Sequence, residues 1–246
     1  MNFQISLAGR IVEIHSLFDK IRQNCEGYLL AEPERKEADI LIEIIEEDLE
    51  REQAAVRQEN KKTGMNARYA PEDLEVTAAY RKIGARMPAF DTFVMHGSVI
   101  STSGKGYMIT APSGIGKTTR SRIWTECIPE SFIVNGDKPL LRVTQDSVYA
   151  YGTPWCGKEG WNANTGVPLK AIFLLERSEA GNRIIEMNLA DAFPQLLHQT
   201  FRPDDPDANR KTLRLLQAMA GKIKVFRFCS EPTAEAVRLA WEKAGG

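Results

Sequence analysis

The segment that most restricts the fold of this chain is a nine-residue stretch, APSGIGKTT, which runs from residue 111 to residue 119. It matches the phosphate-loop pattern of a small residue, four spacers and then Gly-Lys-Ser/Thr, with Ala111 where Gly is commoner. That pattern binds phosphate only between a strand and a helix, where backbone N–H groups and the helix N-terminus converge. The stretch therefore predicts an α/β domain.

The sequence on both sides of this stretch agrees with that prediction. Residues 106–110 are typical of a strand, and residues 117–127 are typical of a helix that Pro129 stops. A second strand is expected over residues 92–100, joined to the first by a turn at 101–105. The strand before the loop is then the second arm of a hairpin, which favours a mixed sheet.

The pattern of apolar residues along the rest of the chain changes near residue 88, which divides the chain into two parts. The first part is expected to hold a hairpin over residues 3–14, a short strand within 38–45 and an amphipathic helix over 71–87. Further strands are expected at 132–134, 139–143, 148–151, 167–175 and 223–228, and helices at 189–200, 209–219 and from 232. We therefore expect an N-terminal α+β part over residues 1–88 and a mixed-sheet P-loop domain over residues 89–246.

Charge restricts the classes of partner. The 246 residues carry 32 Lys+Arg and 33 Asp+Glu, a formal net charge of −1, which argues against a nucleic-acid or membrane-surface binder. Residues 31–62 hold 11 acids and 6 bases, so the rest of the chain holds 22 acids and 26 bases. The acidic run is expected to be a solvated helix or loop, and the mild positive charge lies on the part that carries the motif.

Cysteines, histidines and apolar runs exclude several other classes. The four cysteines and three histidines are scattered, which gives no zinc-site pattern. No apolar run is longer than residues 171–175, and the N-terminus lacks the basic start and apolar core of a signal peptide. A reduced, cytoplasmic setting is the expectation.

Each residue type in the loop suits the binding of a polyphosphate. Gly114 and Gly116 let the backbone curl so that N–H groups point inward, and Lys117 can reach the β- and γ-phosphates. The Thr118 hydroxyl can ligate Mg²⁺. ATP and Mg²⁺ are thus the expected cofactors, and the predicted nucleotide contacts are Ser113, Gly114, Ile115, Gly116, Lys117, Thr118 and Thr119.

Phosphoryl transfer also needs a carboxylate near the phosphates, to hold Mg²⁺ or to take the acceptor's proton. Asp137 follows the strand at 132–134 and lies 20 residues after Lys117. It is the predicted metal ligand alongside Thr118, and it is a candidate catalytic residue. The alternative is that Asp137 is only a turn residue in the sequence Asn-Gly-Asp.

Four sequence blocks follow one another in the second part of the chain. They are HGSVISTSGKGYMITAPSGIGKTT from His96, NGDKPLL from Asn135, YGTPWCGKEGWNANTGVPLKAIFLLER from Tyr151 and KVFRFCSEPTAEAV from Lys224. In this order they resemble the HPr kinase and PEP carboxykinase superfamily. More narrowly, they look like the small HPr-kinase-like proteins, some of which phosphorylate free serine or a peptide. The resemblance covers residues from about 92 to the end, and the first 90 only in general style.

The resemblance also implies roles for three further residues. His96, expected on a strand, matches a histidine near the phosphates that is implicated in the transfer chemistry. Lys158 and Glu159, in a glycine-flanked loop, would close over the acceptor. The family often has two adjacent acids where this chain has Gly136 and Asp137, so Asp137 matches the second. Either Asp137 or His96 is then the general base.

The expected activity is a Mg²⁺-dependent transfer of the ATP γ-phosphoryl group to a hydroxyl. The acceptor is a serine-like small molecule or a peptide or protein, with no nucleic-acid or membrane partner, and the resemblance is compatible with a homo-oligomer. Two alternatives stay open. One is a PEP carboxykinase-like enzyme, for which no matching arginine set is identified. The other is a non-catalytic nucleotide-binding switch, which the missing acid at Gly136 favours.

Overall fold

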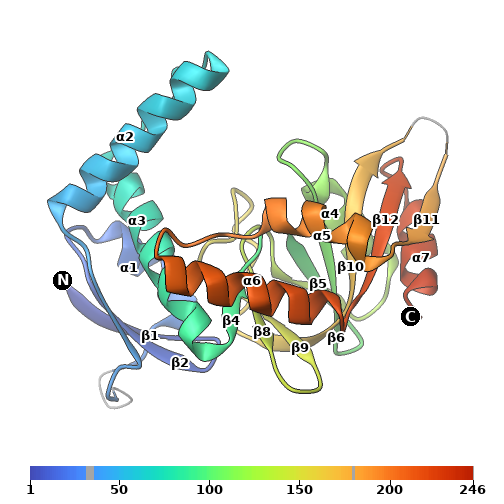
Figure 1. Ribbon diagram of the computed structural model, residues 1–246, viewed down its shortest axis with the longest axis horizontal. Coiled ribbons are helices and arrows are strands. Elements are labelled where there is room, and N and C mark those ends of the chain that lie inside the picture. The colour runs from blue at the N-terminus through green and yellow to red at the C-terminus, as the bar shows by residue number, and fades with distance from the viewer. Residues whose placement is uncertain (32–35, 179–180, 246) are drawn as a thin grey trace. The chain divides into compact units, whose positions relative to one another are not determined.

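The computed structural model describes residues 1–31, 36–178 and 181–245, and the chain divides into two compact units, Met1–Arg86 and Met87–Gly246 (Figure 1). The division near residue 88 into an N-terminal α+β part and a P-loop domain stays a prediction. No helix within the described ranges is both long and apolar enough to cross a membrane. Every residue predicted to form the site lies in the second unit.

The first unit combines a three-stranded sheet with helices. The predicted hairpin is confirmed, and its turn has positive φ at both Ala8 and Gly9. Strand β3 pairs in parallel with β2, and the acidic run forms the helix α2. The elements of this unit are β1 (Asn2–Leu7), β2 (Arg10–His15), α1 (Lys20–Asn24), η1 (Glu26–Tyr28), β3 (Ile40–Glu43), α2 (Glu46–Thr63) and α3 (Pro71–Arg86).

The second unit is built on a curled, mixed nine-stranded sheet. Its strand order is β4-β8-β9-β10-β6-β5-β7, with β12 beside β10 and β11 beside β12. The elements are η3 (Met87–Phe90), β4 (Thr92–Val94), β5 (Ser98–Thr102), β6 (Lys105–Thr110), α4 (Lys117–Cys127), β7 (Ser131–Asn135), β8 (Leu140–Val143), β9 (Val148–Tyr151), β10 (Gly166–Arg177), β11 (Arg183–Glu186), α5 (Leu189–Gln199), α6 (Pro206–Ala220), β12 (Lys224–Ser230) and α7 (Ala234–Lys243). A mixed α/β sheet is what the sequence predicted, whereas β11 was missed.

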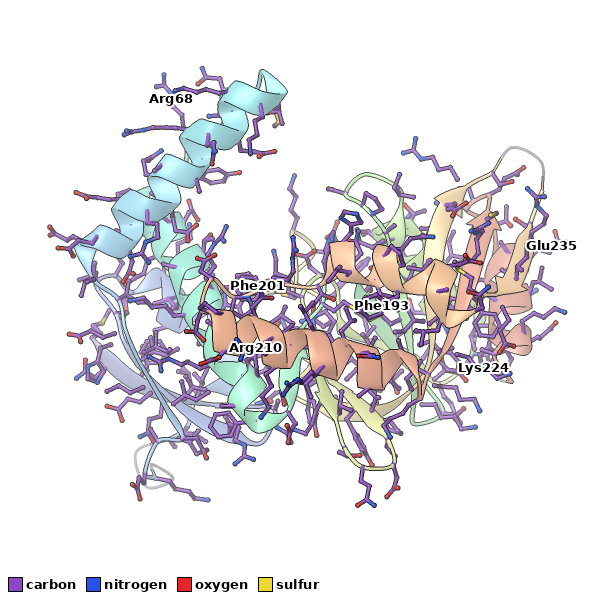
Figure 2. All side chains as sticks on the ribbon, in the orientation of Figure 1. Arg68, Phe193, Phe201, Arg210, Lys224 and Glu235 are labelled. Atoms are coloured by element: carbon purple, nitrogen blue, oxygen red, sulfur yellow. The ribbon has the colours of Figure 1, made fainter. Side chains whose placement is uncertain are left out.

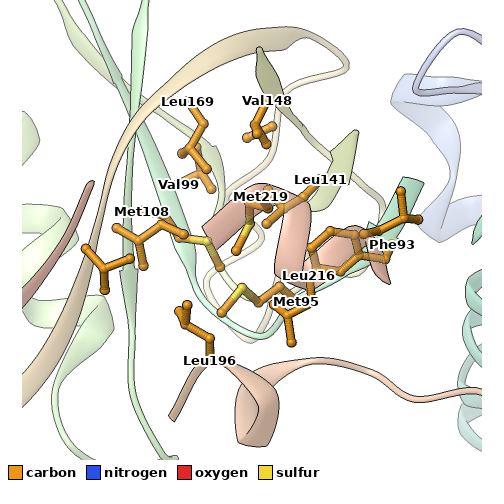
Figure 3. Packing of buried hydrophobic residues seen from close by; sticks show 14 of the residues in the cluster. Phe93, Met95, Val99, Met108, Leu141, Val148, Leu169, Leu196, Leu216 and Met219 are labelled. Carbon is orange, nitrogen blue, oxygen red and sulfur yellow. The ribbon is translucent and has the colours of Figure 1, made fainter. Parts of the chain in front are cut away.

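Strand alternation sends side chains to two cores on opposite faces of this sheet. On β6, Tyr107 and Ile109 join the core under α4 and α7, and Met108 joins the core under α5 and α6. Figure 3 shows the second core, where Met108 lies near Leu196 of α5 and Met95. The sheet is therefore covered by helices on both faces, which leaves its strand ends for a site.

Helix α4 is anchored to the sheet by Trp124, which is fully buried. Its ring lies 5.2 Å from Tyr107 and 5.8 Å from Phe173 between centroids, and its Nε1 donates to Thr102 Oγ1 at 2.9 Å. Loss of such an aromatic side chain typically costs about 3–5 kcal/mol. This anchor fixes the helix that the phosphate-loop sequence leads into.

One predicted element is wrong in a way that matters for the site. The strand expected over residues 92–100 is two strands, β4 paired with β8 and β5 paired with β6 and β7. His96 and Gly97 lie in the break between them, so His96 is not on a strand. The carbonyl of His96 accepts a 2.6 Å hydrogen bond from Thr110 Oγ1. The break thus lies beside the end of β6.

Candidate functional site

The loop from Ala111 to Gly116 joins the end of β6 to the start of α4, the context that the motif requires. Gly114 has φ +81° and Gly116 has φ +108°, conformations that other residues rarely adopt. A Cβ on Gly116 would also lie 2.4 Å from Arg120 Nη1. Both glycines of the motif are therefore required by the local backbone.

Two arginines support this loop from outside. Arg177, at the end of β10, donates through Nη2 to the Gly114 carbonyl at 2.5 Å. Arg120 is buried and donates to the carbonyls of Ser230 at 2.5 Å and Ile115 at 3.5 Å. Because these cations bond carbonyl groups of the loop, they restrain its backbone. The sequence analysis did not predict Arg177, which is 63 residues from its partner.

Lys117 is buried at the first turn of α4. Its Nζ donates to the carbonyls of Ala111 at 2.9 Å and Pro112 at 3.4 Å, so the side chain folds back over the start of the loop. Burial lowers the pKa of its ammonium group, and the negative charge of Asp137 opposes that shift. A lysine held in this way is a buried positive charge next to exposed loop backbone.

His96 and Asp137 form the second part of the site. The His96 Nε2 atom lies 3.1 Å from Asp137 Oδ1, and the Gly97 N–H donates to the Asp137 carbonyl at 2.8 Å. Asp137 comes just after β7, and Lys138 Nζ lies 3.0 Å from its Oδ2. The structure therefore brings together two of the predicted site residues that are 41 positions apart in the sequence.

The ionised form of the Asp137 carboxyl group is strongly favoured. Burial alone would raise the pKa of this carboxyl, but the hydrogen bonds from His96 and Lys138 and the positive charge of Lys138 outweigh it. The pKa of Asp137 is therefore held well below its ordinary value. The side chain keeps 25% of its surface exposed, so the carboxylate is both ionised and accessible.

Gln199, the last residue of α5, is a site residue that the sequence analysis missed. Its Oε1 lies 2.9 Å from His96 Nδ1, and its carbonyl accepts the His96 N–H at 2.7 Å. The two residues are 103 positions apart, and no motif surrounds Gln199. Each ring nitrogen of His96 thus faces an oxygen, an arrangement that suits an imidazolium donating on both sides, or a neutral ring if the Gln199 amide is rotated.

The turn that carries Asp137 is held by Asn135. The Asn135 Oδ1 atom accepts the N–H groups of Asp137 at 2.9 Å and Lys138 at 2.7 Å. Its Nδ2 donates to the Thr153 carbonyl at 3.0 Å. Asn135 is fully buried, so this Asn-Gly-Asp turn is a rigid support for the carboxylate. Asp137 is thus a turn residue, and its functional role stays a prediction.

The loop around Lys158 and Glu159 lies against the same turn. A Cβ on Gly136 would come within 2.6 Å of the Cys156 carbonyl, and one on Gly157 would lie 3.4 Å from Asp137 Cβ. Lys158 and Glu159 themselves are exposed and lie at the tip of this loop. Position 136 therefore has no room for a side chain in the present packing of this loop.

The residues available to a metal ion are few. Within the described ranges, no cluster of three or more His, Cys, Asp or Glu side chains could hold a metal ion. Asp137 supplies one ionised carboxylate, and Thr118 lies in the first turn of α4, next to Lys117. A single carboxylate and a hydroxyl match the way Mg²⁺ is bound when a nucleotide supplies most of its ligands.

Taken together, the fold and the loop define a mixed α/β protein with a phosphate-loop sequence between a strand and a helix. Comparison with known proteins adds little. No family model matches the chain, and no curated protein matches it. Among solved structures, the chain is similar to the HPr(Ser) kinase/phosphatase from Coxiella burnetii, with a TM-score of 0.34 and 13% sequence identity over 62% of this chain and 99% of that one. Residue roles therefore rest on the geometry of this chain alone.

Proposed function

We propose that the protein is an ATP- and Mg²⁺-dependent phosphotransferase that moves a γ-phosphoryl group to a hydroxyl. The observation that carries this proposal is that the pair formed by His96 and Asp137 lies beside the glycine loop. The His96 Nε2 atom lies 3.1 Å from Asp137 Oδ1, and the His96 carbonyl accepts a hydrogen bond from Thr110 Oγ1 at the end of β6, directly before the loop. At the other end of the loop, Asp137 opposes the lowering of the pKa of the buried Lys117 ammonium. A site of this kind holds a polyphosphate and keeps a carboxylate near its end.

The loop and Lys117 would bind the nucleotide. Loop N–H groups and the N-terminal end of α4 offer hydrogen-bond donors and partial positive charge to the phosphates. Lys117 would exchange its bonds to the Ala111 and Pro112 carbonyls for contacts with the β- and γ-phosphates. Its buried charge is a strong stabiliser of the transferring group, because low solvent exposure strengthens electrostatic attraction.

Mg²⁺ would be held by Thr118 and Asp137, with the nucleotide and water supplying the other ligands. When bound, Mg²⁺ neutralises charge on the phosphate oxygens. To bind the metal ion, Asp137 would give up its contact with Lys138 Nζ or with His96 Nε2, because each of its two oxygens now contacts one of these side chains. The donor set fits a nucleotide-bound metal ion and not a metal site formed by protein side chains alone.

Asp137 is the residue of the pair that we assign to the acceptor proton. It is ionised and partly exposed, so it can accept a hydrogen bond from a hydroxyl. Both oxygens of Asp137 and both ring nitrogens of His96 already have a partner, but each carboxylate oxygen keeps a second lone pair that can accept a further hydrogen bond, whereas an imidazole nitrogen has no second one. His96 would then orient Asp137 and stabilise negative charge, and Lys158 and Glu159 would cover the acceptor from the adjoining loop.

Lys117→Met tests the proposal most directly, because methionine keeps the packing of the buried stem and removes the charge. ATP turnover should fall by about 10³-fold or more, with an unfolding midpoint close to that of the wild type. Lys170→Met, on an exposed position of β10, is the matched control and should keep full activity. Wild-type turnover in the Lys117 variant would refute this mechanism.

An acceptor panel separates the alternatives. ADP release would be measured with free L-serine, a serine-containing peptide, oxaloacetate and no addition. Oxaloacetate-dependent turnover would support a carboxykinase instead. Tight ATP binding by calorimetry without any acceptor-dependent turnover would support the nucleotide switch, which Gly136 in place of an acid favours.

A further inference from the structure

A small cavity adjoins the site on the side of α5. Its volume is about 160 Å³, and it lies between the first residues of the phosphate loop, the end of β10 and the last turns of α5. Helix α5 also carries Phe193, labelled in Figure 2, which packs toward the core under α5 and α6. The residues that line the cavity are Thr110, Ala111, Pro112, Leu174, Leu175, Gln195, His198 and Gln199.

Two contacts connect this cavity to the proposed chemistry. The Lys117 ammonium donates to the carbonyls of Ala111 and Pro112, which line one wall. Gln199, which also lines the cavity, lies 2.9 Å through its Oε1 atom from His96 Nδ1, and His96 in turn pairs with Asp137. The cavity lining therefore includes residues that directly contact the lysine that would bind the γ-phosphate and the histidine that pairs with the proposed proton acceptor.

The cavity wall is suited to a neutral molecule. Leu174, Leu175 and Pro112 give it apolar sides, and Gln195 and Gln199 give it two carboxamides one helical turn apart. A carboxamide can donate and accept a hydrogen bond at once. None of the described residues that line it is Lys, Arg, Asp or Glu, and the exposed His198 is the one titratable side chain among them. A zwitterion or a dianion would therefore have at most one charged partner there, which is unfavourable.

We propose that this cavity binds the body of the phosphoryl acceptor, and that the acceptor is a small uncharged alcohol or the hydroxyl-bearing side chain of a peptide. This inference rests on the proposed function. The acceptor oxygen forms a bond to the γ-phosphorus while the bond from that phosphorus to the β-phosphate oxygen breaks. ADP leaves, and the hydroxyl proton goes to Asp137. Free serine, a zwitterion, and oxaloacetate, a dianion, are disfavoured as acceptors.

A matched pair of probes tests this assignment. N-acetyl-L-serinamide and free L-serine carry the same hydroxymethyl group but differ in charge. Ligand-observed NMR on the full chain without nucleotide should show binding of the neutral probe and of n-propanol, and at least tenfold weaker binding of free serine. Equal or tighter binding of free serine, or no binding of either neutral probe, would overturn the proposal.

Variants place the probe in the protein. Gln195→Leu should weaken N-acetyl-L-serinamide binding about tenfold, the usual effect of one buried hydrogen bond. Gln217→Leu makes the same change on an exposed face of α6 and should have no effect. Unchanged binding in Gln195→Leu contradicts the assignment, and so does displacement of the probe by ADP, which would make the cavity a nucleobase site.

The same measurements separate this inference from the proposed function. Binding of the neutral probe needs neither ATP nor turnover. If the cavity binds neutral alcohols but no acceptor-dependent ADP release follows, the cavity assignment holds and the phosphotransferase proposal fails. If turnover occurs best with free serine or oxaloacetate, the phosphotransferase or carboxykinase chemistry holds and the cavity assignment fails.

Discussion

Carboxylates are buried in both units of the chain, but in different surroundings. In the first unit, Asp48 and Glu52 of α2 pair with Lys82 and Arg81 of α3, with 2.9 Å between Arg81 Nε and Glu52 Oε1. Both carboxylates keep less than a tenth of their side-chain surface exposed. In the second unit, Asp137 is also paired with cations but keeps a quarter of its surface exposed.

The pKa shifts of Glu52 and Glu75 run in the opposite direction to that of Asp137. Burial raises the pKa of Glu52 and of Glu75, even though Glu75 accepts the N–H groups of Leu17 and Phe18. The pKa of Asp137 is lowered, because its hydrogen bonds and neighbouring charges outweigh burial. The comparison teaches that the first-unit acids support packing, whereas Asp137 stays charged at a place that a ligand can reach.

The largest expected effect separates catalysis from stability. Asp137→Asn keeps the size of the side chain and removes the charge, so we expect kcat to fall by about 10²–10⁴-fold. The unfolding free energy should change by only about 1 kcal/mol. Asp204→Asn, on an exposed loop residue of the same unit, is the control and should leave kcat unchanged. Full activity in Asp137→Asn would show that Asp137, like the first-unit acids, has no role in catalysis.

The reverse pattern is expected for the first unit. Asp48→Ala removes the partner of Lys82 and the acceptor of the Ile45 N–H at the start of α2. The unfolding free energy should fall by about 2–3 kcal/mol, measured by urea titration. Because these partners of Asp48 all belong to the first unit, kcat at 25 °C should stay within twofold of the wild type. A large loss of kcat without loss of stability would contradict this assignment.

Acid titration sharpens the same contrast. A carboxyl with a lowered folded pKa stabilises the fold above its ordinary pKa near 4 and loses that contribution as the pH falls. A carboxyl with a raised folded pKa, such as Glu75, contributes stability at low pH that is lost as the pH rises through the folded pKa.

Between pH 6 and pH 3, Asp137→Asn should therefore lose less stability than the wild type, and Glu75→Gln should lose more. Each difference should be on the order of 1 kcal/mol. Urea unfolding at several pH values measures it. Parallel pH profiles for wild type and both variants would show that neither carboxyl contributes in the stated direction.

The smallest expected effect concerns the loop beside Asp137. Lys158 is exposed, so Lys158→Ala should leave stability unchanged. If the loop covers the acceptor, the KM for the acceptor should rise by about threefold to tenfold with little change in ATP affinity. An unchanged KM would limit the proposed site to the loop at 111–119, His96 and Asp137.

The parts of the site that follow from sequence are those that local backbone rules control. Helix α4 begins at Lys117 and ends at Cys127 as predicted, because the glycines before it and Pro129 after it act over a few residues. The β5–β6 hairpin follows from alternation and a Ser-Gly turn, where Ser103 and Gly104 have positive φ. The assignment of site roles to these residues stays a prediction.

The parts that could not be predicted depend on contacts distant in sequence. The single strand expected at 92–100 is broken because the backbone at His96 and Gly97 is bonded to Gln199 and Asp137 instead of to a strand. Gly97 itself has no room for a side chain, since a Cβ there would lie 2.5 Å from Met108 Cε. Only the folded sheet brings these partners together.

The close approach between Gly136 and the Cys156 carbonyl has a consequence for how such a site can evolve. The Cβ of a second acid at position 136 would lie only 2.6 Å from that carbonyl oxygen. A chain that gains this acid must therefore move the backbone at residue 156 in the same change. A second acid beside Asp137 and the present position of the Cys156 carbonyl exclude each other.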